Sequence, residues 1–362
     1  MTLHDYITLG ASGLRVSPLC LGAMTFGKEW GWGSTPAESV EVIEAYIASG
    51  GNFIDTANIY TKGRSEAILG EYFSVGAGRG KRDRLVIATK CGGNLFAGDP
   101  NGGGSSRKGI MRSCEESLRR LRTEYIDLYW IHFWDRSTPI AETMRALDDL
   151  VRAGKVRYIG LSDHPAWVCM DALHLARSAG WVVPIALQIE YSLLQRTVEG
   201  ELIPMALANG LGVTPWSPLK SGILSGKYRR DSRPEIGTTR VAADSRALNE
   251  RTFAIVDALV DIGRSVDAAP AQVALAWLQR RPGVASTIIG ARTPAQLEEN
   301  VTSLAVRLSA DQLQHLDALS APDLPFPCEF LENIRAIIQG GTSINGRRTE
   351  PWPLAPREGE MV

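Results

Sequence analysis

The feature that most constrains this chain is the regular alternation of short apolar runs with longer segments of helical periodicity. The short runs, rich in β-branched residues, lie at 19–22, 52–55, 85–89, 125–131, 156–161, 186–189, 212–215 and 286–289. Apolar residues recur at helical spacing at 36–49, 65–73, 107–121, 140–153, 166–179, 199–208, 249–266 and 294–300. Repeated strand–helix units are typical of a parallel sheet. Eight such strands predict an α/β fold whose sheet closes into a (β/α)8 TIM barrel.

The segments outside these units extend the barrel without requiring a second domain. Residues 6–16 have the pattern of a β-hairpin, which we expect to plug the barrel floor. Two further helices are predicted at 270–280 and 310–319, so the barrel domain spans 1–320. The C-terminal extension, 321–362, is predicted to be partly flexible and to lie over or near the face that carries the active site.

Composition and charge favour small-molecule chemistry over binding to nucleic acid or membranes. The chain has 362 residues, 22% charged and 44% hydrophobic, with a formal net charge of -1. Such a chain lacks the basic surface that nucleic acid or an anionic membrane requires. No run approaches the roughly 18 apolar residues of a membrane span, and the start lacks a signal-peptide pattern. Its five cysteines are scattered, which predicts free thiols and a cytoplasmic protein.

Polar side chains collect where the predicted strands end. Asp55 ends the second strand and Tyr60 follows in its loop, while Lys90 and His132 end the third and fourth strands. The later strands end at Ser162-Asp163, Gln188, Trp216-Ser217 and Gly290-Ala-Arg292. Active sites of such barrels lie at the carboxyl ends of the strands, so these residues are predicted to share one site. Each alone also has a structural explanation, because Asp commonly caps helices and His is often satisfied within a core.

Several motifs, in order along the chain, carry a resemblance to a known family. They are Gly22-Ala-Met-Thr-Phe-Gly27, Asp55-Thr-Ala-Asn-Ile-Tyr60 with Ser65-Glu66, Ala88-Thr-Lys90, Ser117-Leu-Arg-Arg-Leu-Arg-Thr-Glu-Tyr-Ile-Asp-Leu-Tyr-Trp-Ile-His132, Gly154-Lys-Val-Arg-Tyr-Ile-Gly-Leu-Ser162, Gln188-Ile-Glu-Tyr-Ser192, and Ile288-Ile-Gly-Ala-Arg292 with Leu297-Glu-Glu-Asn300. On these motifs the chain resembles the aldo-keto reductases from the hairpin to Asn300. The resemblance implies an eight-stranded barrel that binds NADP(H) across its mouth without a Rossmann domain. No Gly-x-Gly-x-x-Gly stands between a strand and a helix, which agrees.

The four residues at the early strand ends are the parts needed to protonate a carbonyl oxygen while a cofactor supplies hydride. Free tyrosine has a pKa of about 10. An ammonium beside the phenol lowers that pKa, and a carboxylate keeps the ammonium charged. We therefore expect Asp55 to support Lys90, Lys90 to tune Tyr60, and Tyr60 to donate the proton. His132 is expected to polarise the carbonyl and to help relay the proton. The predicted reaction is the reversible, NADPH-dependent reduction of an aldehyde or ketone to an alcohol.

The resemblance also implies the cofactor-binding positions. Ser162, Asp163 and Gln188 match residues that hold the nicotinamide carboxamide, and Trp216 matches the aromatic residue on which the ring stacks. Arg292 offers a guanidinium for the 2′-phosphate, which favours NADP over NAD. The other positions are Gly22, Met24, Thr25, Asp55, Ser217, Leu219, Ser221, Lys227, Gly290, Gln296, Glu299 and Asn300. Gln296 and Glu299 also fit helix positions that simply face solvent.

One position departs from the commonest family pattern. Where Gly-x-Ser-Asn is usual, this chain has Gly160-Leu-Ser-Asp163. Asparagine both donates and accepts hydrogen bonds, whereas an ionised aspartate only accepts. Our hypothesis is that Asp163 accepts from the carboxamide and favours the cationic, oxidised nicotinamide. The alternative is that Asp163 keeps only the structural part of the role.

Aromatic loop residues suggest the character of the substrate. Trp30, Trp32, Phe133 and Trp134 are expected at the barrel mouth, where they would favour an apolar or aromatic carbonyl compound or alcohol, although they also fit packed lids. The long polar connection at 220–247 is a candidate lid. No cluster of histidines and cysteines indicates a metal. The sequence does not indicate an oligomeric state.

Two other function classes remain open at this point. Potassium-channel β subunits are similar to aldo-keto reductases and retain bound cofactor, so a cofactor-binding regulatory module is one alternative. A lyase or aldolase that forms a Schiff base through Lys90 is the other. That chemistry needs a neutral amine, which Asp55 would disfavour by keeping Lys90 charged.

Overall fold

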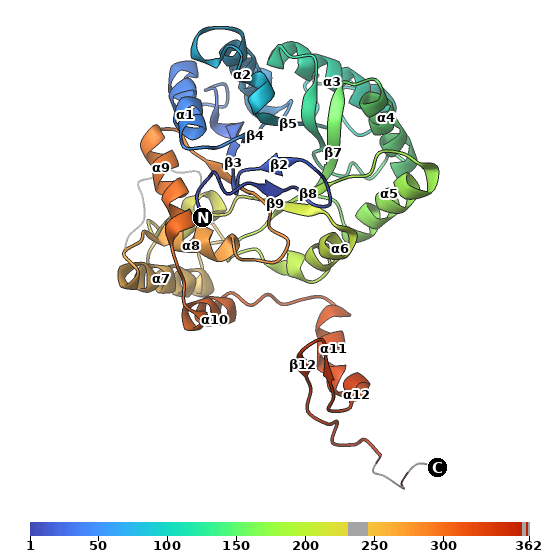
Figure 1. Cartoon of the computed structure of the whole chain (residues 1–362), viewed down its shortest axis with the longest axis vertical. Helices are drawn as coiled ribbons and strands as arrows, with labels where there is room; N and C mark the ends of the chain where they lie inside the picture. The colour runs from blue at the N-terminus through green and yellow to red at the C-terminus, as the bar shows by residue number, and fades with distance from the viewer. Residues whose placement is uncertain (231–244, 357–359, 361–362) are drawn as a thin grey trace.

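Eight parallel strands form the barrel that the alternating pattern predicts. The computed structural model describes residues 1–230, 245–356 and 360. The strands are β3 (Leu19–Gly22), β4 (Phe53–Asp55), β5 (Val86–Cys91), β6 (Ile126–Ile131), β7 (Val156–Ser162), β8 (Ala186–Glu190), β9 (Gly212–Trp216) and β10 (Thr287–Gly290). They pair in the order β10-β3-β4-β5-β6-β7-β8-β9. A parallel bridge between Val213 and Val284 brings the two ends of the sheet together, which confirms the predicted barrel fold (Figure 1).

The helices surround the barrel, as Figure 1 shows. They are α1 (Pro36–Ala48), α2 (Arg64–Ser74), α3 (Arg107–Leu121), α4 (Ile140–Arg152), α5 (Ala166–Ala179), α6 (Leu202–Asn209), α7 (Glu250–Ser265), α8 (Pro270–Leu278), α9 (Pro294–Thr302) and α10 (Ala310–Leu319). Side-chain caps at Thr35, Ser106 and Asn249 fix the starts of three of them. α6 begins later than predicted, because Thr197–Glu199 form a separate 3-10 turn, in which the Glu199 carboxylate accepts from the Tyr191 hydroxyl.

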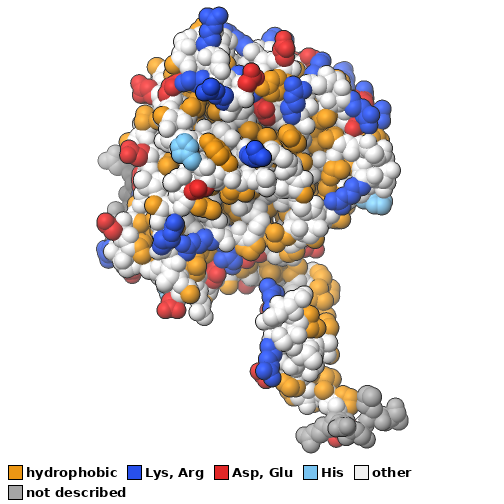
Figure 2. Space-filling model, in the orientation of Figure 1, with side chains coloured by type: hydrophobic (Ala, Val, Ile, Leu, Met, Phe, Trp, Pro, Cys, Tyr) orange, Lys and Arg blue, Asp and Glu red, His pale blue; other side chains and the backbone are white. Residues whose placement is uncertain are grey.

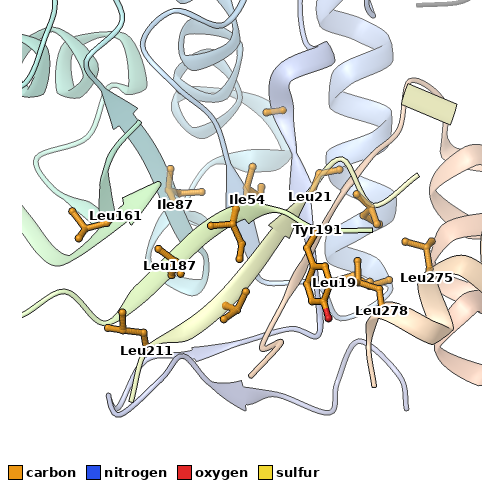
Figure 3. Close-up of a cluster of buried hydrophobic side chains, with 14 of the residues drawn as sticks. Leu19, Leu21, Ile54, Ile87, Leu161, Leu187, Tyr191, Leu211, Leu275 and Leu278 are labelled. Atoms are coloured by element: carbon orange, nitrogen blue, oxygen red, sulfur yellow. The ribbon is translucent and has the colours of Figure 1, made fainter. Parts of the chain in front are cut away.

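Alternation along the strands sorts side chains between the inside and the outside of the barrel. Phe53 packs inside, whereas Ile54 faces the surrounding helices in the larger core (Figure 3). The next inward position is Asp55, which is buried. In β5, Ala88 likewise packs inside and is followed two residues later by the buried Lys90. The period of two therefore places a carboxylate and an ammonium inside the same barrel.

The N-terminal hairpin closes the end of the barrel opposite the mouth. β1 (Ile7–Thr8) and β2 (Arg15–Val16) pair antiparallel, as predicted, and lie across the barrel in Figure 1. The amide of Ala11 donates to the Gly210 carbonyl at 2.7 Å, just before β9 begins. The turn requires a glycine at Gly10, which has a φ of +62°, because a Cβ there would lie 2.3 Å from a backbone oxygen. The predicted floor plug is confirmed.

The chain after α10 forms a separate set of small elements. They are α11 (Cys328–Asn333), α12 (Arg335–Gln339), and a hairpin of β11 (Ser343–Ile344) and β12 (Arg347–Arg348). Figure 1 shows them projecting from the barrel near α6 and α10. The domain boundary near 320 and a position over the active-site face stay predictions. Half of the candidate lid, residues 231–244, lies outside the described residues. No helix in the described ranges is long and apolar enough to cross a membrane.

Candidate active site

Lys90 lies at the centre of the site, fully buried at the carboxyl end of β5. Its ammonium forms an ion pair with Asp55 and donates to the Thr56 carbonyl at 2.8 Å. It also donates to the Tyr60 hydroxyl at 3.3 Å. The structure thus brings together three of the four residues predicted to be catalytic, and it holds the ammonium between a carboxylate and a phenol.

Burial and charge act against each other in this group. Burial raises the pKa of Asp55, although Lys90 opposes the rise. Burial opposes the charged form of Lys90, but Asp55 and Tyr60 outweigh it and raise its pKa above the usual value. We therefore infer that Lys90 stays an ammonium ion. A charged amine is not a nucleophile, which argues against a Schiff base.

The pKa of Tyr60 is raised, mainly by burial, while Lys90 reduces the rise. Lys90 acts to lower the Tyr60 pKa, as predicted. The predicted net lowering of that pKa is wrong, because burial raises it by more. Desolvation of the phenolate is the physical reason. Tyr60 is consequently protonated near neutral pH, which is the form that a proton donor needs.

His132 is a neutral imidazole in this environment. Burial, with a smaller contribution from Lys90, lowers its pKa to about 3. Its ring lies 5.6 Å from the Tyr60 ring, at an angle of 79°. Its Nδ1 atom is buried and has no hydrogen-bond partner among the described residues. A neutral ring suits hydrogen bonding to a carbonyl oxygen, but the low pKa disfavours the proton relay that we expected of His132.

The residues predicted to hold the carboxamide line the ends of β7, β8 and β9. Asp163 has a φ of +50°, a conformation that Asp and Asn tolerate better than most residues. Its Oδ1 atom accepts from the Trp216 indole at 3.0 Å. Gln188 donates to Asp55 at 3.1 Å, so it also supports the buried ion pair. The Ser162 hydroxyl is buried without a partner among the described residues, which leaves a polar atom for a ligand.

The loop after β9, at the predicted pyrophosphate positions, is tightly turned. Ser217, Lys220 and Ser221 have φ values of +53°, +45° and +56°, and Gly222 follows at +89°. These left-handed positions form tight turns, in which the amides of Lys220 and Gly222 donate to the carbonyls of Ser217 and Leu219. A Cβ at Gly222 would lie 3.0 Å from the Lys227 ammonium. The predicted pyrophosphate positions thus share one loop, together with Leu219 at its start.

The predicted adenosine positions lie where β10 meets α9. The Gln296 side chain accepts from the Arg292 backbone at 2.9 Å, and Asn300 donates to the Gly290 carbonyl at 3.2 Å. Glu299 is exposed on α9. The Arg292 guanidinium is exposed and forms no ion pair with any described residue. This arrangement leaves the guanidinium accessible to an anionic ligand.

The end of β3 and the loop after it adjoin both the catalytic group and the predicted adenosine positions. Gly22 pairs in register with Asp55 on one side and with Gly290 on the other. Met24 and Thr25 follow in a 3-10 turn, where the Thr25 hydroxyl donates to the Ala291 carbonyl at 3.3 Å. These positions therefore link the catalytic group to the predicted adenosine end.

Three of the four aromatic residues predicted for the substrate pocket gather around the catalytic group. Trp30 lies 6.2 Å from the Tyr60 ring and 5.6 Å from Trp32. Phe133 stacks on His132 at 5.0 Å. Trp134 instead meets the Trp167 ring at 5.3 Å and lines a cavity beside Asp163 and Trp216. The aromatic residues thus form two groups.

Several polar residues of the mouth were not among the predicted site residues. The cavity beside Trp216, of about 360 Å³, is also lined by Arg136, His164, Glu190 and Gln195. Glu190 forms an ion pair with Lys220 across the β8 and β9 loops. Glu190 stands two residues after Gln188 in a quoted motif, so the motif contained the signal, whereas Arg136 and His164 had none.

Three features of the described residues fit NADP(H). The Lys227 ammonium, beside Gly222 in the loop after β9, suits a pyrophosphate, and the exposed Arg292 suits a further phosphate. The orphaned Ser162 hydroxyl and the Asp163 carboxylate suit an amide. These three features lie at the carboxyl ends of β9, β10 and β7 or in the loops that follow, at the same ends of the strands as Lys90.

Comparison with known proteins agrees with this geometry. A sequence model of the Aldo/keto reductase family matches residues 18–321. The chain belongs to the aldo-keto reductase family. The family resemblance inferred from the motifs is confirmed, and the chain is an oxidoreductase of this family.

Relatives within the aldo-keto reductases are similar over most of their length. A norsolorinic acid reductase of Emericella nidulans is 38% identical over 88% of this chain and 82% of its own. An aryl-alcohol dehydrogenase (NADP+) of Phanerodontia chrysosporium is 36% identical over 84% of this chain and 83% of its own. An uncharacterized oxidoreductase of Bacillus subtilis is 35% identical over 86% of this chain and 95% of its own.

Proposed function

We propose that this aldo-keto reductase uses NADPH to reduce an aldehyde or ketone to an alcohol, with Tyr60 as the proton donor. The observation that carries the proposal is the placement of the buried Lys90 ammonium, which is paired with Asp55 and lies 3.3 Å from the Tyr60 hydroxyl. An ammonium in that position stabilises the phenolate that forms when Tyr60 gives up its proton.

The chain's own residues orient the carbonyl and hold the proton. Neutral His132 donates a hydrogen bond to the carbonyl oxygen and makes the carbon more electrophilic. Tyr60 then protonates that oxygen, and Asp55 keeps Lys90 charged throughout. NADPH, when bound, supplies the hydride. In the reverse direction the Tyr60 phenolate accepts the alcohol proton.

We infer that the substrate is an aromatic carbonyl compound, because Trp30, Trp32 and Phe133 surround Tyr60 and His132. The names of the relatives, an aryl-alcohol dehydrogenase among them, support this class. A panel of aromatic and aliphatic aldehydes should be tested with NADPH and with NADH, by following cofactor absorbance. We expect the highest kcat/KM for aromatic aldehydes with NADPH. A preference for short aliphatic aldehydes would contradict the inference.

Arg292 should set the preference for NADPH over NADH. The Arg292→Ala variant loses a charge-assisted contact to the 2′-phosphate, so we expect the KM for NADPH to rise about 10- to 100-fold. The KM for NADH should stay within about twofold, since NADH lacks that phosphate. Arg264→Ala, which removes an exposed arginine on α7, is the matched control. If Arg292→Ala changed the KM for NADPH and the KM for NADH equally, another residue would have to bind the 2′-phosphate.

Asp163 should favour the oxidised cofactor, and this effect should depend on pH. Part of Asp163 is exposed, but burial of its carboxyl group raises the pKa to about 6, and the Trp216 hydrogen bond only partly opposes the rise. Above that pH the group is anionic and attracts the cationic nicotinamide, and below it the attraction is lost. We expect the affinity for NADP+ relative to NADPH to increase as pH rises from 5 to 7, by several-fold.

Asp163→Asn is the matched variant, because its amide oxygen keeps an acceptor for the Trp216 indole. The ratio of the two affinities should become nearly independent of pH in this variant. Titration of both cofactors by fluorescence at each pH measures the ratio directly. An identical ratio in the wild type and in Asp163→Asn would leave Asp163 only its structural role.

A further inference from the structure

The C-terminal extension exposes an unusual amount of apolar surface. We call residues 321–356 the arm. Half of the large hydrophobic side chains that are exposed in the described residues belong to it, although it is a small part of the chain. They are Phe326, Phe330, Leu331, Ile337, Ile338, Ile344 and Leu354. Figure 2 shows hydrophobic side chains along the part of the arm that projects from the barrel. Exposed patches of this size normally mark an interaction site.

The arm's elements are too short to be stable without a surface to pack on. α11 has 6 residues and α12 has 5, and the β11–β12 hairpin pairs only two residues on each side. None of these elements has a buried residue. Isolated helices shorter than about 12 residues and isolated hairpins are marginal in water. The arm therefore needs a partner that covers its apolar side chains.

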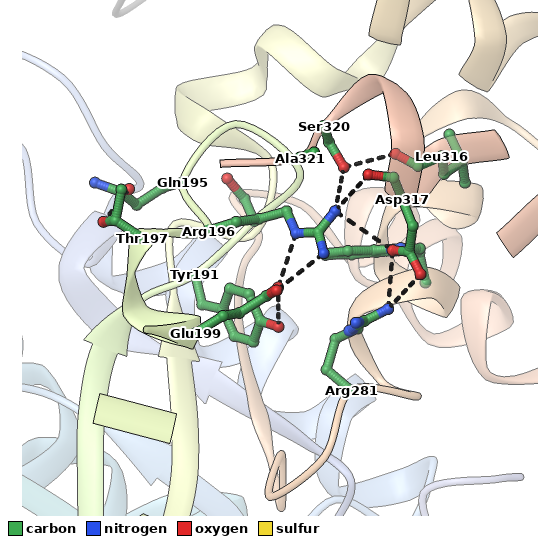
Figure 4. Close-up of polar contacts among 12 residues, drawn as sticks. Tyr191, Gln195, Arg196, Thr197, Glu199, Arg281, Leu316, Asp317, Ser320 and Ala321 are labelled. Carbon is green, nitrogen blue, oxygen red and sulfur yellow. Dashed lines mark hydrogen bonds and ion pairs between the residues drawn. The ribbon is translucent and has the colours of Figure 1, made fainter. Parts of the chain in front are cut away.

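The root of the arm is firmly held, which fixes where the arm leaves the barrel. Arg196 donates to the Ser320 hydroxyl at 2.8 Å and to the Asp317 carbonyl at 2.9 Å, within the network of Figure 4. Arg251 donates to the carbonyls of Ser320 and Ala321. Cys328 lies against Gly200, in the loop between β8 and α6. From this root α11 and α12 extend away from their own barrel (Figure 1).

The barrel carries one exposed apolar surface suited to receive such an arm. Trp167 and Met170 are exposed by 63% and 38% and lie three residues apart on α5. That spacing places them on the same face of the helix. Trp134 extends the surface, because its ring meets the Trp167 ring. The other exposed large hydrophobic residues of the described barrel are spread over separate elements.

We propose that the arm docks on a second copy of this chain, against the α5 surface that contains Trp167 and Met170. Reciprocal docking of two arms gives a closed, two-fold dimer. The exposed parts of the seven apolar side chains total roughly 650–850 Å² per arm, so covering about 60% of them removes roughly 400–500 Å² of each arm from water. Two arms and the surfaces that they cover then account for about 1,600–2,000 Å², the size of a standard specific interface. One such exchange therefore supplies the area that a stable dimer needs.

Sedimentation of the full-length protein tests the proposal. We expect the wild type to sediment at twice the 39.3 kDa mass of the chain. The arm variant Phe330→Glu/Ile338→Glu should weaken the dimer at least ~100-fold, because it places two charges in an apolar interface. Met170→Glu, on the receiving surface, should act in the same direction. Val75→Glu changes another exposed hydrophobic residue, outside both surfaces, and should leave the dimer unchanged.

Three results would overturn the proposal. A wild-type monomer at micromolar concentrations would exclude the second copy, and arm amides protected from hydrogen exchange in that monomer would show that the arm packs on its own barrel. A dimer that survives in the arm variant would place the interface elsewhere. A dimer lost in the arm variant but kept in Met170→Glu would show that the arm does not dock on the α5 surface. No substituted residue lies in the core, so each variant should fold. Cofactor binding by each variant checks that the barrel is folded.

Discussion

The Tyr60→Phe variant should lose about 10²- to 10⁴-fold of the wild-type kcat for reduction of an aromatic aldehyde, the usual contribution of a positioned general acid. The substitution removes only the hydroxyl that lies 3.3 Å from the Lys90 ammonium. His132 remains neutral, and with a pKa of about 3 it holds no proton that it can readily give up. The Lys90 ammonium also holds its proton, because its pairing with Asp55 raises its pKa, so neither neighbour readily replaces the lost acid.

The comparison needs a variant that loses a tyrosine hydroxyl elsewhere. Tyr6 lies just before β1, at the hairpin end of the barrel, and donates to the Gly50 carbonyl. Tyr6→Phe should therefore keep full activity. Steady-state kinetics and fluorescence titration with NADPH separate catalysis from binding. We expect Tyr60→Phe to bind NADPH within a few-fold of the wild type. A Tyr60→Phe enzyme that retains more than a tenth of the wild-type kcat would show that another group donates the proton.

The second large effect is on stability, in the Lys90→Met variant. Lys90 and Asp55 are both buried, and removing the ammonium leaves the Asp55 carboxylate without its ion pair. Breaking a buried pair in this way costs about 3–5 kcal/mol of the free energy of unfolding. Gln188 still donates to Asp55, but a single neutral donor does not replace a charge. Urea denaturation at pH 7 measures the loss.

The pH dependence and a second variant identify the cause. Burial already raises the pKa of Asp55, and loss of Lys90 removes the main opposing charge. A carboxyl group whose pKa is raised by folding destabilises the protein as pH rises above its unfolded value, so the loss in Lys90→Met should shrink as pH falls from 7 toward 5. The Asp55→Asn/Lys90→Met variant carries neither charge and should recover most of the stability. A double variant as unstable as Lys90→Met would place the cost in packing instead.

A surface pair provides the scale for this experiment. Lys81 and Glu44 form an ion pair at 2.7 Å, with roughly a third of each side chain exposed. Exposed pairs contribute about 0–1 kcal/mol, so Lys81→Met should change the free energy of unfolding by no more than that amount. The contrast between the two lysines is what the burial of Lys90 predicts.

The sequence was most informative where a repeating pattern and a strand end coincide. Asp55 and Lys90 were predicted to share one site because each ends a strand, and the parallel register brings them together inside the barrel. The strand-end rule for barrels likewise placed Ser162, Gln188 and Trp216 around one mouth. These predictions depend on backbone geometry, which a periodic sequence determines.

The sequence was least informative where the outcome depends on which side chain a residue meets. The bond between Asp163 and Trp216, and the turn of Trp134 toward Trp167, arise from loops with no periodic signal. The net direction of the Tyr60 pKa depends on the balance of burial against one charge, which only the packed structure provides. The exposure of the arm's apolar side chains was also not predicted, because the sequence does not show which apolar residues the fold leaves uncovered.

The central claim is that the Lys90, Asp55, Tyr60 and His132 group reduces a carbonyl compound, and a single-turnover measurement tests it most directly. NADPH is first bound to excess wild-type enzyme, and an aromatic aldehyde is then added while the absorbance of the bound cofactor is followed. We predict a rapid loss of NADPH absorbance equal to one equivalent, and at least a hundredfold slower loss in Tyr60→Phe. NADPH that stays bound and unoxidised in the wild type, with every aldehyde of the panel, would contradict the claim and favour a cofactor-binding regulatory module.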